Sequence, residues 1–304
     1  MKTIIFLVGP TAVGKTAVSI CAAKILNAEI ISCDSMQIYK GMDIGTQKPS
    51  SAQLGKVPHH MIGIMSPLKS FSVADFRKRA LRCIKDIERR GKSVIFAGGT
   101  ALYMKTLVDG LFLSPATDYA LRKKLLSEEH ENGNGYLYKK LCNVDAETAK
   151  LLHPNDTRRI IRALEVYINT KTPISELKKT TKGLKERYSI RIFCLNRDRE
   201  NLYRIIDRRV DLMFRKGLLA ECGRLKDKRL STTARQALGY KEVFDYLDKR
   251  INLNDAKESI KKRTRNFAKR QLSWFRNDSR IEWIDIDNYS PKQAAGIICK
   301  KLMR

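Results

Sequence analysis

The chain has 304 residues, of which 43% are hydrophobic, a proportion typical of a globular protein with one large domain or two ordinary ones. No apolar run approaches the roughly 20 residues of a membrane span, which argues against a membrane protein and favours a cytoplasmic location. The 60 lysine and arginine residues outnumber the 32 aspartate and glutamate residues, and the formal net charge of +28 predicts a polyanionic partner, with nucleic acid first. The seven cysteines are scattered and form no C-x-x-C pair, so neither a disulfide framework nor a zinc site is indicated.

Four runs rich in apolar and β-branched residues predict buried strands, and helical patterns separate them. The predicted strands cover residues 3–9, 28–35, 92–100 and 188–196, and a last edge strand is expected at 281–287. Strands that alternate with helices are typical of a parallel sheet that is flanked by helices. The sequence therefore predicts the α/β fold class.

The middle of the chain has a different pattern, because residues 116–186 are helical in spacing and contain no strand run. Pro115 indicates a loop before this segment, and Asp118 indicates the start of a helix. We therefore predict an α/β core formed by residues 1–115 and 187–304, with an all-helical insertion domain between its two parts.

The octapeptide GPTAVGKT follows the first predicted strand and precedes a helical pattern. This spacing predicts a phosphate-binding loop (P-loop), in which backbone amides and a helix N-terminus bind anionic oxygens. Lys15 would reach the terminal phosphates, and the Thr16 hydroxyl would bind Mg²⁺. The loop consists of Gly9, Pro10, Thr11, Ala12, Val13, Gly14, Lys15 and Thr16. It recognises a diphosphate with its metal and leaves the rest of the ligand open, with ATP as the default.

Polar and small residues follow the second and third predicted strands. Because the carboxyl ends of parallel strands line the crevice of an open α/β sheet, Asp34, Ser35 and Thr100 are expected near the P-loop. Gly98 and Gly99 would let a ligand approach the backbone there. By its position alone, Asp34 is a magnesium ligand, a general base or a turn residue.

Two or more long basic helices are predicted over residues 199–278. In the segment 261–276, seven of sixteen residues are basic and none is acidic. One helical stripe would pack on the core, and it consists of Ala268, Leu272 and Phe275. The other stripe would meet phosphates or solvent, and it consists of Arg263, Phe267, Arg270 and Trp274.

Three arginines of the segment 204–214 could clamp a diphosphate, namely Arg204, Arg208 and Arg209. Ion pairs with Asp207 or Asp211 are the competing interpretation. The four histidines have no metal-site spacing, and we interpret all of them as structural, including the adjacent His59 and His60.

Eight segments, in order along nearly the whole chain, resemble the bacterial tRNA dimethylallyltransferases. They are GPTAVGKT, ISCDSMQIYKGMDIGTQKP, PHHMIG, FAGGTALYMKTLVDGL, HPNDTRRIIRALEV, DRRVDLMFRKGLLAE, RQALGYKEV and KRTRNFAKRQLSWFR. The resemblance implies that the diphosphate belongs to dimethylallyl diphosphate. Its prenyl group would be transferred to N6 of the adenosine that lies 3′ to the anticodon, in tRNAs that read codons beginning with U.

The resemblance also implies roles for individual residues. Asp34 matches the general base of the family, which takes a proton from the weakly nucleophilic adenine amino group. The departing diphosphate would be neutralised by Lys15, the loop amides, Mg²⁺ at Thr16 and an arginine that matches Arg209. The resemblance further implies that the insertion domain contacts the anticodon stem from one side.

Contacts with the tRNA anticodon stem-loop, carried over from the family motifs, fall on several segments. The residues are Asp34, Ser35, Met36, Gln37, Thr100, Arg122, Arg158, Arg159, Ile160, Ile161, Arg162, Arg235, Gln236, Gly239, Tyr240, Lys241, Arg263, Arg265, Lys269 and Arg270. They would grip the backbone around an adenosine that leaves its stack. A monomer is expected, because one adenosine requires one site.

Three alternatives remain open on the sequence. A P-loop nucleoside or nucleic-acid kinase would use ATP as the donor and Asp34 as a ligand of magnesium or of the acceptor hydroxyl. A nucleotide-regulated RNA-binding protein would perform no chemistry. Some relatives of the family prenylate free AMP or ATP, which the basic helices and the insertion domain argue against.

Overall fold

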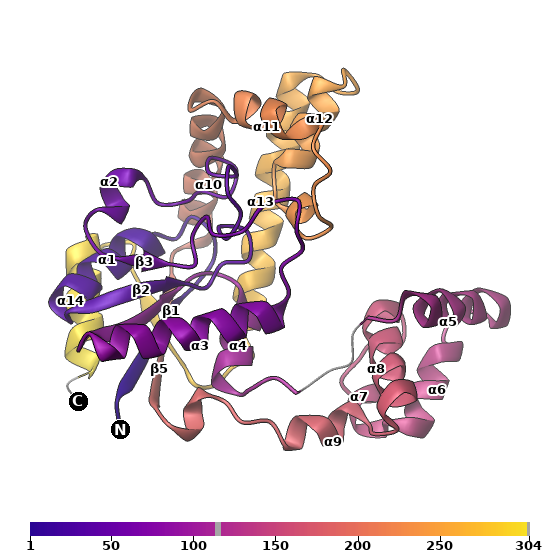
Figure 1. The fold of residues 1–304 in the computed structure, drawn as a ribbon. Helices are drawn as coiled ribbons and strands as arrows, with labels where there is room; N and C mark the ends of the chain where they lie inside the picture. Colours follow the sequence, from indigo (N-terminus) through magenta and orange to yellow (C-terminus); the bar gives the residue numbers. More distant parts are fainter. Residues whose placement is uncertain (113–116, 303–304) are drawn as a thin grey trace. The chain divides into compact units, whose positions relative to one another are not determined.

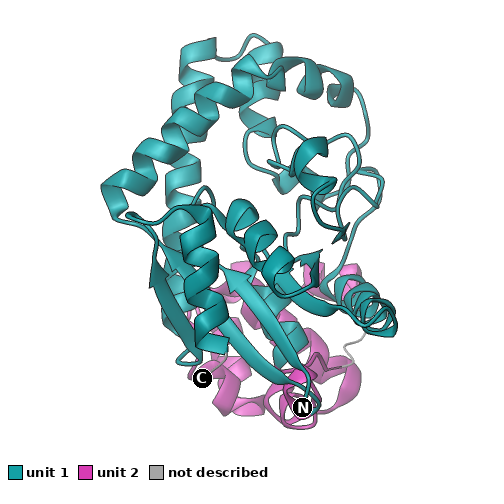
Figure 2. Ribbon diagram, turned by 90° about the vertical axis from the view of Figure 1, so that its left-hand side faces the viewer, with its two compact units in different colours: residues 1–108, 187–304 teal, residues 109–186 magenta. Residues whose placement is uncertain are grey.

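The computed structural model describes residues 1–112 and 117–302. The chain folds into two compact units (Figure 2). The first consists of Met1–Val108 and Arg187–Arg304, and the second consists of Asp109–Glu186. The second unit thus begins at Asp109, before the predicted start of the insertion domain. That predicted boundary, between residues 115 and 116, and the predicted loop at Pro115 lie outside the described residues.

The first unit is built on a six-stranded sheet in which every pair of neighbouring strands is parallel (Figure 1). The strand order is β3-β2-β4-β1-β5-β6. The strands are β1 Thr3–Val8, β2 Ala28–Ser32, β3 His59–His60, β4 Ser93–Ala97, β5 Ser189–Asn196 and β6 Ile281–Asp285. The predicted fold class is confirmed, and the expected edge strand at 281–287 is β6.

Two differences from the predicted strands have a physical reason. β2 ends at Ser32 and β4 ends at Ala97, before the ends predicted for them, because the residues that follow bend away to form loops at the edge of the sheet. β3 was not predicted, since two residues are too short to produce an alternating pattern. His60 in this strand forms a hydrogen bond with Glu29 of β2, with 2.6 Å between Nε2 and Oε2, and this supports the structural interpretation of this histidine.

One face of the sheet packs against α1 (Lys15–Ile25), α14 (Pro291–Leu302) and the first turns of α10 (Arg199–Arg215). The buried side chains on this face come from alternate strand positions, such as Ile5 and Leu7 of β1. Burial of this apolar layer stabilises the sheet and orients α1, whose N-terminus follows directly from the P-loop.

The opposite face is covered by α3 (Val73–Arg89) and α4 (Ala101–Val108), as Figure 1 shows. Phe76 of α3 stacks on Tyr103 of α4, with 3.8 Å between the ring centroids. A capping box at Ser72 begins α3, and the short helix α2 (Ser51–Leu54) begins with another at Ser50.

The predicted long basic helices occupy the region from residue 199 to residue 276. They are α10, α11 (Leu218–Lys226), the short η2 (Ala234–Gln236), α12 (Tyr240–Leu247) and α13 (Leu253–Arg276). α13 packs on α12 and α10, and its C-terminal half reaches the core through the expected stripe: Ala268 and Phe275 are buried, and Leu272 is partly buried.

The described residues of the second unit form helices joined by loops, with no strand. Its elements are α5 Tyr119–Asn132, α6 Tyr136–Val144, α7 Ala146–Ala149, α8 Thr157–Thr170, α9 Ile174–Lys179 and η1 Leu184–Glu186. Asp118 caps α5, as predicted for a helix start, because its side chain accepts a hydrogen bond from the Leu121 amide. Leu125, Leu137, Leu141 and Leu164 are among the buried residues of its own core. Across the described ranges of the chain, no helix is both long enough and apolar enough to traverse a bilayer.

Candidate functional site

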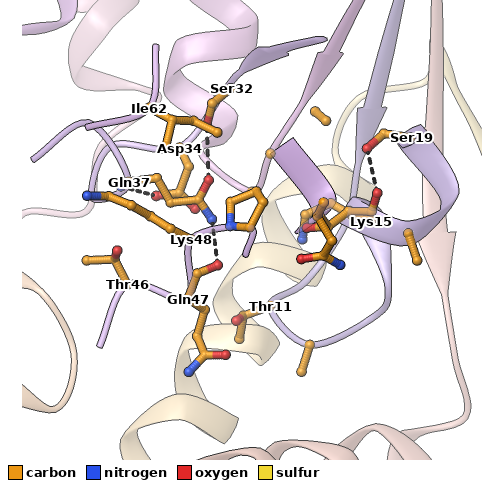
Figure 3. Close-up of a pocket in the computed structure, with 18 of the residues that line it drawn as sticks. Thr11, Lys15, Ser19, Ser32, Asp34, Gln37, Thr46, Gln47, Lys48 and Ile62 are labelled. Carbon is orange, nitrogen blue, oxygen red and sulfur yellow. Dashed lines mark hydrogen bonds between the residues drawn. The ribbon is translucent and has the colours of Figure 1, made fainter. Parts of the chain in front are cut away.

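A cavity of about 600 Å³ opens at the carboxyl ends of β1, β2 and β4 (Figure 3). In an open α/β sheet this edge is where ligands bind. Side chains from the P-loop, from the segment after β2, from α10 and from α13 line it. Four of the lining residues are basic and Asp34 is the acidic one, so the cavity suits an anionic ligand; the basic residues are Lys15, Lys48, Arg209 and Lys216.

The P-loop has the geometry that its spacing predicts. Gly9 has a φ of 141°, and a Cβ at this position would lie 2.7 Å from the carbonyl oxygen of Leu195, so no other residue fits here. Gly14 is the N-cap of α1, so the first amides of this helix point into the loop. Together these amides form a site for anionic oxygens.

Lys15 has a poorly solvated ammonium group. Its Nζ donates hydrogen bonds to the carbonyl oxygens of Gly9, at 2.9 Å, and Pro10, at 2.7 Å. Burial lowers the pKa of Lys15 to about 8, although the nearby Asp34 carboxylate acts in the opposite direction. A bound phosphate would supply the counter-charge that the lysine lacks.

Thr16 lines the cavity beside Lys15. No group of three or more His, Cys, Asp or Glu that could hold a metal ion occurs among the residues that the structure describes. Mg²⁺ needs no such group, because it commonly keeps several waters and binds substrate phosphates together with one or two protein oxygens. The Thr16 hydroxyl at the P-loop fits that requirement.

Asp34 follows the end of β2 and points into the cavity (Figure 3). Its Oδ1 accepts hydrogen bonds from the amides of Met36, at 2.8 Å, and Gln37, at 3.3 Å. Its Oδ2 accepts no hydrogen bond from the described part of the chain. One oxygen thus fixes the carboxylate, and the other is available to a ligand.

Ser35 and Thr100 connect the ends of β2 and β4. The Ser35 amide donates to the Thr100 Oγ1 at 3.0 Å, and the Thr100 amide donates to the Cys33 carbonyl at 3.1 Å. Neither residue belongs to the cavity lining, and neither does Met36, whereas Gln37 does.

Arg209 is the arginine of α10 that reaches the cavity. Its Nε donates to the Gln47 Oε1 at 2.6 Å, and its Nη1 donates to the Thr11 Oγ1 at 3.4 Å. Burial lowers the pKa of Arg209 to about 10, against the influence of Asp34. The side chain nevertheless remains charged at neutral pH.

The structure corrects the prediction for the other two arginines of this segment. Arg204 and Arg208 lie on the exposed face of α10 and do not line the cavity, because the helix turns Leu202, Ile206 and Val210 towards the core. The competing ion pairs do form, but with other partners: Asp207 pairs with Arg265, and Asp211 pairs with Lys261.

Several residues at the site were not found from the sequence. Gln271 of α13 is buried, accepts a hydrogen bond from the Thr11 amide and donates one to the Gly99 carbonyl, both at 2.8 Å. Gln47 and Lys48 line the cavity after β2. His59 also lines it, and its Nδ1 contacts the Val57 carbonyl at 2.7 Å. In the sequence, Gln271 differs from its neighbours only as a neutral side chain within a basic helix, which does not indicate a role at the site.

Burial corrects three of the predicted tRNA contacts. Ile160 and Ile161 belong to the core of the second unit, with exposed fractions of 1% and 8%. Tyr240 is completely buried, and its hydroxyl donates to the Glu221 carboxylate at 2.7 Å. These side chains pack inside the protein, because each faces the apolar side of its helix, and they cannot contact RNA.

Five predicted contact arginines hold carboxylates of the protein. Arg122 and Arg162 both bind Glu165, which is completely buried in the second unit. Arg263 pairs with Glu242, Arg265 pairs with Asp207, and Arg159 pairs with Asp156 at the start of its own helix. Arg159 is nevertheless exposed, as are the predicted contact residues Arg158, Arg235, Gln236, Lys241, Lys269 and Arg270. Gly239 is buried at the start of α12.

Comparison with known proteins decides the family. The family model described as IPP transferase matches residues 37–278 of this chain. The chain belongs to the IPP transferase family. The resemblance inferred from the sequence motifs is therefore confirmed.

Known relatives are similar to this chain over nearly their whole length. A tRNA dimethylallyltransferase of Carboxydothermus hydrogenoformans is 47% identical over 99% of this chain and 96% of that protein. The tRNA dimethylallyltransferase of Bacillus subtilis is 46% identical over 94% of this chain and 91% of that protein.

Solved structures agree with this relationship. The tRNA isopentenylpyrophosphate transferase of Bacillus halodurans is 38% identical, with a TM-score of 0.73 that covers 100% of this chain and 97% of the other. A eukaryotic dimethylallyltransferase, described as acting on tRNA, is 29% identical, with a TM-score of 0.81 that covers 100% of this chain and 80% of the other.

Proposed function

We propose that this IPP transferase is a tRNA dimethylallyltransferase. It transfers the dimethylallyl group from dimethylallyl diphosphate to N6 of the adenosine 3′ to the anticodon in tRNAs that read codons beginning with U, and it releases diphosphate. The observation that carries this proposal is one cavity in which the P-loop, Arg209 and the Asp34 carboxylate meet. The names of the relatives support the same activity.

The basic side of the cavity suits the leaving diphosphate. The bond between the allylic carbon and the diphosphate oxygen breaks with its electron pair on oxygen, so negative charge grows on the diphosphate. Lys15, Arg209 and the P-loop amides would stabilise that charge. A Mg²⁺ ion held at Thr16 would supply further charge stabilisation.

Asp34 suits the acceptor side of the reaction. The adenine amino group is a weak nucleophile, because its lone pair is delocalised into the ring. As the new bond between N6 and the allylic carbon forms, a proton must leave N6, and in this proposal Asp34 Oδ2 receives it, since Oδ1 already accepts two amide hydrogen bonds. The hydrogen bonds at Oδ1 hold the carboxylate while Oδ2 acts.

The exposed basic residues suit an RNA backbone. Lys269 and Arg270 lie on α13, the helix whose Phe267 and Gln271 line the cavity. If these side chains bind the phosphates that flank the target adenosine, they would help to hold that base outside its stack. We further propose a monomer that acts on cytoplasmic tRNA.

The experiment compares two donors. Purified protein, Mg²⁺ and tRNA from cells that lack the modification are incubated with dimethylallyl diphosphate or with ATP, and the nuclease digest is examined by mass spectrometry. Prenylated adenosine with dimethylallyl diphosphate alone supports the proposal. Consumption of ATP without prenylated adenosine would favour the kinase alternative. Free AMP replaces tRNA in a third reaction, where product would move the acceptor to the free nucleotide.

A further inference from the structure

Two side chains hold the guanidinium of Arg209, and Gln47 makes the shorter contact. A guanidinium has five N–H donors, and the donors of Arg209 that bind described residues are Nε, to Gln47, and Nη1, to Thr11. The bond to Gln47 is the shorter, at 2.6 Å against 3.4 Å. Nη2 binds no described residue, so it is the part of the guanidinium that can meet a ligand in the cavity.

Gln47 is itself held by three hydrogen bonds. Its backbone has a φ of 56°, a left-handed conformation that is uncommon for a residue other than glycine. Its Nε2 and its backbone amide both donate to the Ile44 carbonyl, at 2.8 and 3.1 Å, and its backbone carbonyl accepts from the Gln37 Nε2 at 3.2 Å. Because an Nε2 can only donate and an Oε1 can only accept, only one orientation of the Gln47 side-chain amide makes both the bond to the Ile44 carbonyl and the bond from Arg209.

The loop that carries Gln47 is anchored on a buried carboxylate. Glu221 of α11 is 2% exposed, and it accepts hydrogen bonds from the amides of Asp43, Ile44 and Gly45 at 2.7, 2.8 and 2.9 Å. The Tyr240 hydroxyl provides a fourth donor. A Cβ on Gly45 would lie 2.5 Å from the Tyr240 ring, so only glycine allows this close approach.

We propose that Gln47 is a positioning residue that orients Arg209 towards the diphosphate, with residues 43–48 held in place by Glu221. Its role rests on the proposed function, because that function places the diphosphate in this cavity. A neutral acceptor suits this role, because it fixes the Nε edge of the guanidinium and leaves the positive charge of Arg209 for the ligand, whereas a carboxylate would neutralise it.

The test replaces the amide with a side chain of similar length that cannot accept this bond. For Gln47→Met, we expect kcat/KM for dimethylallyl diphosphate to fall about 10-fold and the Kd for inorganic pyrophosphate to rise by a similar factor. The KM for tRNA should change less than two-fold, and the melting temperature should stay close to that of the native protein. Gln293→Met is the matched control, because Gln293 is an exposed glutamine of α14, outside the cavity. Gln47→Glu should weaken pyrophosphate binding more than Gln47→Met does.

A double-mutant cycle with Arg209→Ala identifies the route of the effect. If Gln47 acts through Arg209, Gln47→Met should change pyrophosphate affinity less than two-fold in the Arg209→Ala background. An equal loss in both backgrounds, or an unchanged affinity for Arg209→Ala alone, would overturn the positioning role. If the native protein forms no prenylated adenosine while the cycle still shows coupling, the proposed function fails and the positioning role stands.

Discussion

The side chain of Gln271 accepts a hydrogen bond from the backbone amide of Thr11 at 2.8 Å. This bond joins α13, with its exposed basic residues, to the P-loop, although 260 residues separate the two in the chain. The amide of the same side chain donates to the carbonyl of Gly99, after β4. One buried glutamine therefore connects the proposed RNA-binding helix to the proposed diphosphate site.

Gln271→Leu tests this connection. The substitution leaves the Thr11 amide and the Gly99 carbonyl without their partner, which costs about 1–3 kcal/mol for a buried polar group. We expect a lower free energy of unfolding and weaker pyrophosphate binding, measured by denaturant titration and calorimetry. Gln293→Leu, at an exposed glutamine outside the cavity, should leave pyrophosphate binding unchanged, and the loss of its exposed bonds to Ser290 should cost less stability than Gln271→Leu. Reduced stability with native pyrophosphate affinity would show that the bond does not shape the P-loop.

Asp34→Asn tests the general base. Asparagine can still accept the bonds from the Met36 and Gln37 amides through its carbonyl oxygen, but it cannot take a proton. Turnover should fall by roughly 10²–10⁴-fold, the range of general acid–base catalysis, while the Kd for tRNA changes little. Asp34→Ala should behave in the same way. Asp227→Asn, at an exposed carboxylate outside the cavity, should retain native turnover. A collapse of tRNA affinity with normal turnover per complex would contradict the role.

The pKa of Lys15 predicts a pH dependence of stability. Because burial lowers this pKa from 10.5 to about 8, the unfolded chain binds more protons than the folded one between these values. The native protein should therefore gain stability as the pH rises from about 8 to 10.5. Lys15→Met lacks this gain. The free energy of unfolding of the native protein should therefore increase relative to that of the variant over this pH range, by about 3 kcal/mol at most. A difference independent of pH would mean that the pKa is not lowered.

The same titration predicts how the ligand affinity changes with pH. Above pH 8, Lys15 is increasingly neutral in the free protein, so pyrophosphate binding must recover a proton. The affinity should therefore decline from pH 7.5 to pH 9.5, and calorimetry in buffers of different ionisation enthalpy should detect proton uptake. The Lys15→Met variant should bind pyrophosphate weakly. Its affinity should not show the decline with pH that the titration of Lys15 causes.

The arginines of the second unit should separate into two classes. Glu165 is buried; burial alone would raise its pKa, but hydrogen bonds from Arg122 and Arg162 outweigh that effect and lower it. Arg122→Ala removes two hydrogen bonds from the buried Glu165, which keeps those of Arg162 and the Asp118 amide, and should lower the melting temperature, with a cost of about 1–3 kcal/mol. Arg158→Ala, at an exposed arginine, should keep the native melting temperature. It should weaken tRNA binding and reduce the salt dependence of log K by about 0.7–0.9. Equal melting temperatures for the two variants would argue against the structural role of Arg122.

The accuracy of the sequence-based predictions depended on how local each signal was. The P-loop and the stripe of Ala268, Leu272 and Phe275 were predictable, because neighbouring residues carry each pattern. Tyr240 was not predictable as a buried residue: a tyrosine in a polar loop motif can face RNA or the interior, and contact with Glu221 decides between them. In the same way, Arg122 has no sequence signal for its pairing with Glu165, which lies 43 residues away.

By itself, the sequence determined the phosphate-binding loop, the parallel α/β core, the placement of Asp34 at a strand end and the family to which the chain belongs. All of these follow from the order and spacing of residues close together in the chain. The motif resemblance had already pointed to Arg209; the tertiary structure alone decided that Arg204 and Arg208 lie away from the cavity, and that Gln47 and Gln271 support the site. The reason is physical: the side of a helix that is buried, and the atoms that a side chain meets there, depend on packing between segments that are distant in the sequence.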